Sequence, residues 1–247
     1  MSSVKINYYG RTGNHILMYL MGQYIAEKYN LAFDVKFDDY ENVKSLFDIS
    51  VYSGTNSYDT QQEITDDNVL EFLKNNTLTH NVVLNGFFQS PLILGDAHIQ
   101  ECYKRYIKPK QIMNGSDLFV HVRLGDIENR HSLPYEYYRD SIQRVDFSSG
   151  VISSDSPQHE IVQRLRFEFG LDILIASPVD TIYYGTQCKN LVLSAGTFSF
   201  LSAFYSNNSK VFCIDNPTML KYFGISAWGP DIFSIFESKE NFYLYGK

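Results

Sequence analysis

VKINYYGRTGNHILMYLMGQYIAEKYNLAFDVKF, residues 4–37, contains three segments with different patterns of apolar residues. Residues 4–9 alternate and are rich in strand formers, which predicts a β-strand. Residues 14–29 carry apolar side chains at helical spacing, and one side holds Ile16, Leu17, Leu20, Met21 and Tyr24. Residues 31–37 predict a second strand. A strand, a loop, a helix and another strand in this order are typical of a parallel α/β layer.

The alternation of strands and helices continues along the rest of the chain. Residues 38–80 are polar and predict a loop-rich insertion with a short helix at 69–74. Further strands are predicted at 81–89, 117–123, 150–153, 172–175, 191–194 and 210–214, and helices at 91–106, 134–144, 157–169, after Asp180 and at 198–205. A stretch rich in Lys, Pro, Asn and Gly at 108–116 is typical of a linker.

We therefore expect an α/β protein of two Rossmann-like lobes that face each other across a cleft. The first lobe would comprise residues 1–112 and the second residues 113–247, and the last residues would be able to pack back on the first lobe.

Composition narrows the class of protein. Hydrophobic residues make up 44% of the 247 residues and charged residues 20%, which excludes an intrinsically disordered chain. The formal net charge of −7 argues against nucleic-acid binding, because such proteins need an excess of basic residues to neutralise phosphates. We find no signal peptide, no apolar run of the roughly 18 residues that span a bilayer, and no metal-type spacing of cysteines. These features predict a soluble, cytoplasmic protein.

Gly10-Arg11-Thr12-Gly13-Asn14 joins the first predicted strand to the first predicted helix. Glycines let the backbone approach a ligand closely, and a helix N-terminus offers N–H groups to an anion. Gly13 and Asn14 are therefore candidate ligand-binding residues. The alternative is a tight turn in which Asn14 is only the N-cap of the helix.

His121-Val122-Arg123-Leu124-Gly125-Asp126 lies at the carboxyl end of a predicted strand, where open α/β sheets bind ligands. Strand alternation places His121 and Arg123 on the same face of the sheet. An arginine there binds phosphate with its planar fork, and a histidine hydrogen-bonds a base or a sugar. The alternative is an ion pair between Arg123 and Asp126 that only stabilises the fold.

Two further strand ends carry small polar residues. Ser194-Ala195-Gly196-Thr197-Phe198-Ser199 offers hydroxyl and backbone N–H groups to a phosphate, unless Ser194 or Thr197 simply caps a helix. Ser153-Ser154-Asp155-Ser156-Pro157 offers a carboxylate to the N–H donors of guanine, although Asp or Ser before Pro is also a common helix start.

The ordered set of motifs resembles the α-1,2-fucosyltransferases of glycosyltransferase family 11. In chain order these motifs are GxxGN at 10–14, NGFFQS at 85–90, HVRLGD at 121–126, YYxxSI at 137–142, SDSP at 154–157, TQC at 186–188 and SAGTFS at 194–199. The resemblance covers roughly residues 4–214. Leu124 stands where the family usually has a second arginine, and the first loop carries Arg11, Thr12 and His15 in place of the usual residues.

The resemblance implies a GT-B fold in which the first lobe receives the acceptor and the second binds the nucleotide sugar. It implies an inverting transfer of L-fucose from GDP-β-L-fucose to a glycan hydroxyl, with no metal and no cofactor beyond the donor substrate. A galactoside α-1,2-fucosyltransferase is the corresponding activity. By position, Arg123 would contact the β-phosphate, His121 would lie near the guanosine and Asp155 would face the guanine. Ser194, Thr197, Phe198, Gly13 and Asn14 would surround the diphosphate, with Ser154 beside Asp155.

The sequence leaves three questions open: the general base, the donor sugar and whether the protein is catalytic. The general base would come from Asp126, Glu128 or His131, and we favour Asp126 as the second catalytic residue beside Arg123. The donor would alternatively be another nucleotide deoxysugar, such as a rhamnose. A third possibility is a non-catalytic module that binds nucleotides or glycans, with some of the 19 tyrosines and 18 phenylalanines stacking on sugars.

Overall fold

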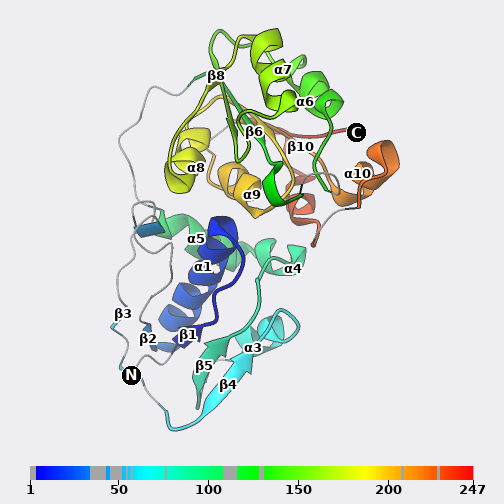
Figure 1. The fold of residues 1–247 in the computed structure, drawn as a ribbon. Coiled ribbons are helices and arrows are strands. Elements are labelled where there is room, and N and C mark those ends of the chain that lie inside the picture. The colour runs from blue at the N-terminus through cyan, green and yellow to red at the C-terminus, as the bar shows by residue number, and fades with distance from the viewer. Residues whose placement is uncertain are drawn as a thin grey trace. The chain divides into compact units, whose positions relative to one another are not determined.

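The computed structural model describes residues 4–33, 43–44, 52–53, 55–56, 58–75, 77–107, 116–127, 131–206, 209–226 and 229–246. The chain divides into two compact units, Met1–Lys110 and Gln111–Lys247, and Figure 1 labels most of their elements. Each unit has its own β-sheet.

The first unit is built on a five-stranded sheet in the order β3-β2-β1-β5-β4. β2, β1, β5 and β4 run parallel, and β3 pairs antiparallel with β2. The elements are β1 (Val4–Ile6), α1 (Thr12–Tyr29), β2 (Ala32–Phe33), β3 (Tyr52–Ser53), β4 (Gln61–Ile64), α3 (Val69–Lys74), β5 (Asn81–Leu84), α4 (Pro91–Leu94) and α5 (Ala97–Tyr106).

α1 is the longest helix of the described residues and is buried over most of its surface. Of its 18 residues 15 are buried, so the apolar stripe predicted from the sequence is too narrow. Met18, Tyr19 and Ile25 lie outside that stripe and are also fully buried. In the described part of the chain, no helix combines the length and the apolar character needed to cross a membrane.

Two parts of the first unit differ from the sequence prediction. Residues 38–80, predicted as a loop-rich insertion, supply β3 and the edge strand β4, which pairs parallel with β5 from Gln61 to Ile64. The helix predicted over 91–106 is two helices, because the carboxylate of Asp96 accepts hydrogen bonds from the backbone N–H groups of His98 and Ile99, both at 3.0 Å. This capping starts a new helix after Gly95.

The second unit is built on a six-stranded sheet in the order β11-β10-β9-β6-β7-β8, and all of its paired strands run parallel. Its elements are β6 (Leu118–Val122), η1 (Gly125–Ile127), α6 (Tyr135–Ile142), β7 (Gly150–Ser154), α7 (Glu160–Phe169), β8 (Asp172–Ile173), α8 (Pro178–Thr186), β9 (Asn190–Leu193), α9 (Thr197–Phe204), β10 (Lys210–Cys213), α10 (Asn216–Phe223), η2 (Ile232–Phe236) and β11 (Phe242–Leu244). The predicted α/β fold with two Rossmann-like units is confirmed.

The two faces of the second sheet are covered by different helices. Leu118, Val120 and Val122 pack in one buried cluster with residues of α6 and α7. Phe119 and His121 face the opposite way, where Phe119 lies near Tyr184 of α8. β6 therefore alternates as the sequence predicts, and this alternation directs His121 toward α9.

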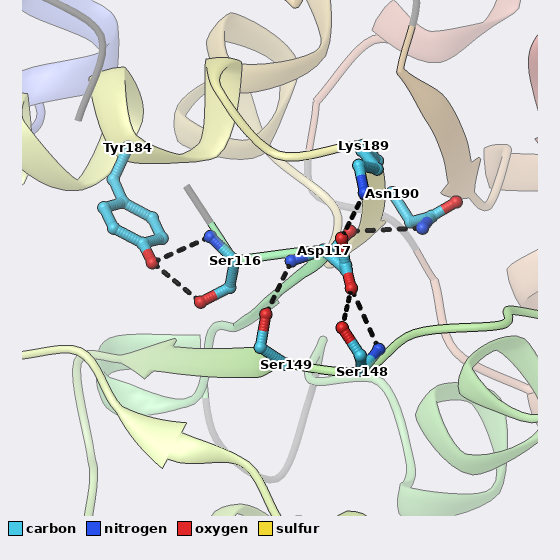
Figure 2. A network of polar contacts seen from close by, with 7 residues as sticks. All are labelled: Ser116, Asp117, Ser148, Ser149, Tyr184, Lys189 and Asn190. Carbon is cyan, nitrogen blue, oxygen red and sulfur yellow. Dashed lines mark hydrogen bonds and ion pairs between the residues drawn. The ribbon is translucent and has the colours of Figure 1, made fainter. Parts of the chain in front are cut away.

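A polar network secures the amino end of the same sheet, around the start of β6 (Figure 2). The carboxylate of Asp117 accepts hydrogen bonds from Lys189 Nζ at 2.5 Å and from the backbone N–H and the hydroxyl of Ser148. The Asn190 amide donates to the Asp117 carbonyl at 3.1 Å. These contacts hold the pKa of Asp117 well below its usual range, because they stabilise the ionised form. They tie the entry of β6 to the segments before β7 and β9.

Candidate functional site

The carboxyl ends of β7, β6 and β9 lie side by side in the second sheet. His121 of β6 is in register with Ser153 of β7 and Leu193 of β9, and the backbone N–H of Ser194 donates to the His121 carbonyl at 3.0 Å. Three motifs that are separated along the chain therefore meet at one edge. This is the edge at which parallel α/β sheets bind ligands.

Arg123 follows β6 and reaches the start of α9. Gly196, the residue before α9, has a φ of +106° and a ψ of 167°, a conformation that is accessible almost only to glycine. A Cβ atom at residue 196 would lie 2.8 Å from Nη1 of Arg123. The half-buried guanidinium therefore lies against the backbone of this loop.

The start of α9 favours an anion at the same place. The N-cap of α9 is Gly196, which has no side chain of its own to cap the N–H groups of the first turn. Thr197 is the first residue of the helix and is buried, whereas Phe198 is half-buried. A guanidinium beside a helix N-terminus gives two sources of positive potential, which together suit a phosphate.

His121 is held in a buried cluster of hydroxyl groups. Its Nδ1 atom lies 2.7 Å from Ser199 Oγ and 3.1 Å from Ser194 Oγ, and the two serine oxygens lie 3.0 Å apart. The imidazole also stacks on Phe198, with ring centroids 4.7 Å apart. Burial is the main cause that lowers the pKa of His121 to about 4, so the ring is neutral at pH 7.

Asp155 supports the loop that carries Arg123. Its Oδ1 atom accepts hydrogen bonds from the backbone N–H groups of Leu124 at 2.9 Å and Gly125 at 3.2 Å. The residue is exposed, so the carboxylate lies at the surface of this edge.

α7 begins only at Glu160, with His159 as its N-cap, so the alternative that Asp155 or Ser156 starts this helix is wrong. Ser154 is half-buried, and its hydroxyl accepts from the Ser156 N–H at 3.0 Å.

Of the three candidates for the general base, the structure describes the side chain of His131 only. Asp126 lies in η1, directly after the Arg123 loop, and its side chain lies outside what the structure describes. Glu128 also lies outside the described residues. His131 is half-buried, and its Nδ1 atom hydrogen-bonds to the Ser226 carbonyl. The assignment of Asp126 as the base stays a prediction.

Gly13 and Asn14 belong to the first unit, at the carboxyl end of β1. α1 begins at Thr12 with Arg11 as its N-cap, so the alternative that Asn14 is the N-cap is wrong. The Asn14 side chain fills the space beside Gly10, where a Cβ atom would lie 2.1 Å from its Nδ2 atom. Its Oδ1 atom accepts a hydrogen bond from Gln89 Nε2 at 2.9 Å. Asn14 thus links the start of α1, which follows β1, to the segment that follows the neighbouring strand β5.

Sequence reasoning did not assign Ser199, Gly196 or Gln89 to this chemistry. Ser199 and Gly196 belong to the SAGTFS motif and Gln89 to NGFFQS, but the sequence pattern alone indicates no role for them. Their partners are distant in sequence, as the separation of 78 residues between His121 and Ser199 illustrates. Among the described residues, no group of three or more His, Cys, Asp or Glu side chains is placed to hold a metal ion.

Comparisons with known proteins show the fold. No protein-family model and no curated protein matches the sequence. Among solved structures, the chain is similar to the α-1,6-fucosyltransferase NodZ co-crystallised with GDP, with a TM-score of 0.58 and 11% identity over 82% of this chain and 91% of that chain. This similarity confirms the GT-B type fold class that was expected from the sequence.

Two further structures are similar at lower scores. One is a mutant of Arabidopsis thaliana FUT1 in complex with GDP, with a TM-score of 0.45 and 11% identity over 85% of this chain and 69% of that chain. The other is KpsC from Thermosulfurimonas dismutans, a β-Kdo 2,7 transferase, with a TM-score of 0.33 and 11% identity over 94% and 84% of the two chains.

Proposed function

We propose that this protein is an inverting, metal-independent glycosyltransferase that moves L-fucose from GDP-β-L-fucose to a hydroxyl of a glycan, forming an α-1,2 linkage. The observation that carries the proposal is the position of Arg123, whose guanidinium lies against Gly196, the N-cap of α9. The fold supports it as well, because the similar NodZ structure is that of a fucosyltransferase crystallised with GDP. The resemblance of the motif set to α-1,2-fucosyltransferases supports the proposed linkage.

The proposed reaction is a direct displacement at the anomeric carbon of fucose. The oxygen of the acceptor hydroxyl attacks this carbon, and the bond to the β-phosphate oxygen of GDP breaks. Negative charge therefore grows on the diphosphate as it leaves. Arg123 and the N–H groups of α9 stabilise this charge more strongly in the transition state than in the bound donor, and each such donor contributes about 3–4 kcal/mol.

The other residues of the edge have roles that fit this reaction. Asp155 would accept hydrogen bonds from guanine while its Oδ1 atom also holds the loop of Arg123. Asp126 would take the proton from the acceptor hydroxyl. The acceptor would be bound by the first unit, with Asn14 and Gly13 near the diphosphate. Positive charge comes from the protein itself, so we propose that the transfer needs no metal ion.

The test compares variants of Arg123 in a transfer assay with GDP-fucose and a small panel of glycans. Arg123→Ala should lower the rate of fucosyl transfer by at least about 100-fold, because a charged donor to the leaving group is lost. Arg123→Lys should recover only part of the rate, because an ammonium lacks the planar fork. Arg166→Ala, which removes a guanidinium from α7, is the matched control and should stay within about two-fold of the parent protein.

The same assay separates this proposal from its alternatives. Activity of Arg123→Ala within a few-fold of the parent would contradict the role of Arg123. Calorimetric titration with GDP, UDP and dTDP identifies the nucleotide, and tighter binding of dTDP would point to another deoxysugar donor. GDP binding without transfer to any glycan of the panel, and without hydrolysis of GDP-fucose, would point to a non-catalytic binding module.

A further inference from the structure

The first turn of α9 is fastened to the rest of the edge by buried contacts that the proposed reaction does not itself use. Ser199 is the third residue of this helix and is fully buried, and Ser194 at the end of β9 is 2% exposed. Both hydroxyls surround Nδ1 of His121, at 2.7 and 3.1 Å. Three segments, β6, the end of β9 and the start of α9, therefore meet in one closed triangle of polar atoms.

This triangle determines which atom of His121 is available to a ligand. Both hydrogen bonds that the His121 side chain makes with described residues use Nδ1. The ring stacks on Phe198, with centroids 4.7 Å apart, and lies parallel to the ring of Phe119, with centroids 6.5 Å apart. In either tautomer of the neutral ring, Nδ1 is therefore occupied by the serines. Nε2 is the ring nitrogen that remains for a hydrogen bond to a bound molecule.

The triangle also controls the anion-binding end of α9. Phe198 and Ser199 both contact the His121 ring, and Gly196, one residue before the helix, lies against Arg123. The first turn is therefore held by His121, and the residue that precedes it lies against Arg123. A shift of this turn would move its N–H groups away from the place where the guanidinium would hold a phosphate.

We propose that Ser199 and Ser194 are positioning residues for nucleotide binding: they hold His121 with Nδ1 turned inward and Nε2 left for the nucleotide, and they fix the first turn of α9 beside Arg123. This inference rests on the proposed function, since it takes the ligand to be a nucleoside diphosphate. It replaces the sequence-based role of Ser194 as a direct phosphate contact, because the Ser194 hydroxyl is buried and already bonded.

The experiment measures binding of GDP and of inorganic pyrophosphate to the 247-residue chain by calorimetry. Ser199→Ala should weaken GDP binding about ten-fold, because a buried hydrogen-bonding group loses its partner. Ser199→Thr keeps the hydroxyl and should restore most of the affinity. Ser202→Ala is the matched control, since Ser202 is fully buried in the same helix but its hydroxyl points to the Phe198 carbonyl at 3.5 Å rather than to His121. It should bind GDP as the parent does.

A second readout is the ¹⁵N NMR signal of the His121 ring, measured with and without GDP. Ser199→Ala should shift the Nδ1 signal of the free protein, and Ser202→Ala should leave it unchanged. GDP added to the parent should shift Nε2 more than Nδ1. Unchanged Nδ1 in Ser199→Ala, a larger GDP shift at Nδ1 than at Nε2, or equal loss of affinity in the Ser199 and Ser202 variants would each overturn the inference.

Failure of the proposed function gives a different result. In that case the parent protein binds neither GDP nor pyrophosphate. The Nδ1 signals of the free parent, Ser199→Ala and Ser202→Ala proteins then decide whether the serines position His121.

Discussion

His121 is a polar residue whose surroundings fix its charge. Its ordinary pKa is 6.5, and burial lowers the pKa in the folded protein to about 4. Between these two values the unfolded chain carries a proton that the folded protein does not, so acid favours unfolding. The stability that depends on a neutral His121 is complete above pH 6.5 and is lost as the pH falls toward 4.

This difference predicts a pH-dependent stability that His121 controls. From pH 7 to pH 5 the free energy of unfolding should fall by about 2 kcal/mol through His121 alone. His121→Asn keeps a polar atom near the position of Nδ1 but does not titrate, so its stability should depend less on pH in this range. Chemical denaturation at both pH values measures the effect. His98→Asn, which removes an exposed histidine, should keep the parental dependence, and an equal pH dependence in the His121 variant would contradict the assignment.

Asp155 has two roles that substitution can separate. The asparagine in Asp155→Asn still offers an oxygen to the N–H groups of Leu124 and Gly125, but it has lost the charge and one acceptor for guanine. We expect this variant to keep its stability and to lose about ten-fold of its preference for GDP over UDP. Asp155→Ala should lose the same preference and also about 1 kcal/mol of stability, a small value because the residue is exposed. Calorimetry and chemical denaturation give the two quantities, and full GDP preference in both variants would show that Asp155 supports only the loop.

For single residues, the sequence predicts which polar side chains lie at the carboxyl ends of strands. It does not predict which side chains of other elements contact them. His121, Arg123, Asp155 and Ser194 follow from strand alternation and from the rule that ligands bind at carboxyl ends. Ser199 was not assigned because a serine in the first turn of a helix usually has only a local role. Its partner His121 is 78 residues away, and only the parallel pairing of β6 with β9 brings the two together.

At the scale of elements, the loop between β9 and α9 has a backbone conformation that only glycine adopts readily. Gly196→Ala should cost about 1–3 kcal/mol of stability. It should also displace Arg123, because the new Cβ atom would lie 2.8 Å from Nη1, and weaken GDP binding about ten-fold or more.

Gly170→Ala is the control for this prediction. Gly170 ends α7 with a φ of +65° and has open space where a Cβ would lie. This variant should lose stability but bind GDP as the parent does. Thermal unfolding and calorimetry distinguish the two effects, and parental GDP affinity in a folded Gly196→Ala protein would remove the link between this loop and Arg123.

The sequence did not predict the strand β4, and its position in the sheet is the physical cause. β4 reads QQEI over Gln61–Ile64, and three of its four residues are exposed because it lies at the edge of its sheet. An edge strand needs few apolar side chains, so its pattern resembles that of a loop. β6, in the middle of its sheet, is buried along all five residues and was predicted to within one residue at each end.

At the scale of the whole molecule, the proposed donor site is distributed unequally over the two units. Arg123, His121, Asp155 and the first turn of α9 all belong to Gln111–Lys247, whereas Gly13 and Asn14 belong to Met1–Lys110. The second unit also holds every strand of its own six-stranded sheet and a buried core formed from its own residues. A compact unit of this size with its own core is expected to fold alone.

This distribution predicts that residues 111–247 bind the nucleotide without the rest of the chain. The isolated fragment should unfold cooperatively and bind GDP within about ten-fold of the 247-residue chain, because the proposed contacts that it lacks are those of Gly13 and Asn14. It should not transfer fucose, since the unit proposed to bind the acceptor is missing. Residues 1–110 serve as the control and should not bind GDP. Calorimetry on fragments whose folding has been checked by circular dichroism measures both affinities. A folded 111–247 fragment that fails to bind GDP, when the full chain binds it, would show that the first unit supplies the main contacts to the donor and that Arg123 is not sufficient to hold the diphosphate.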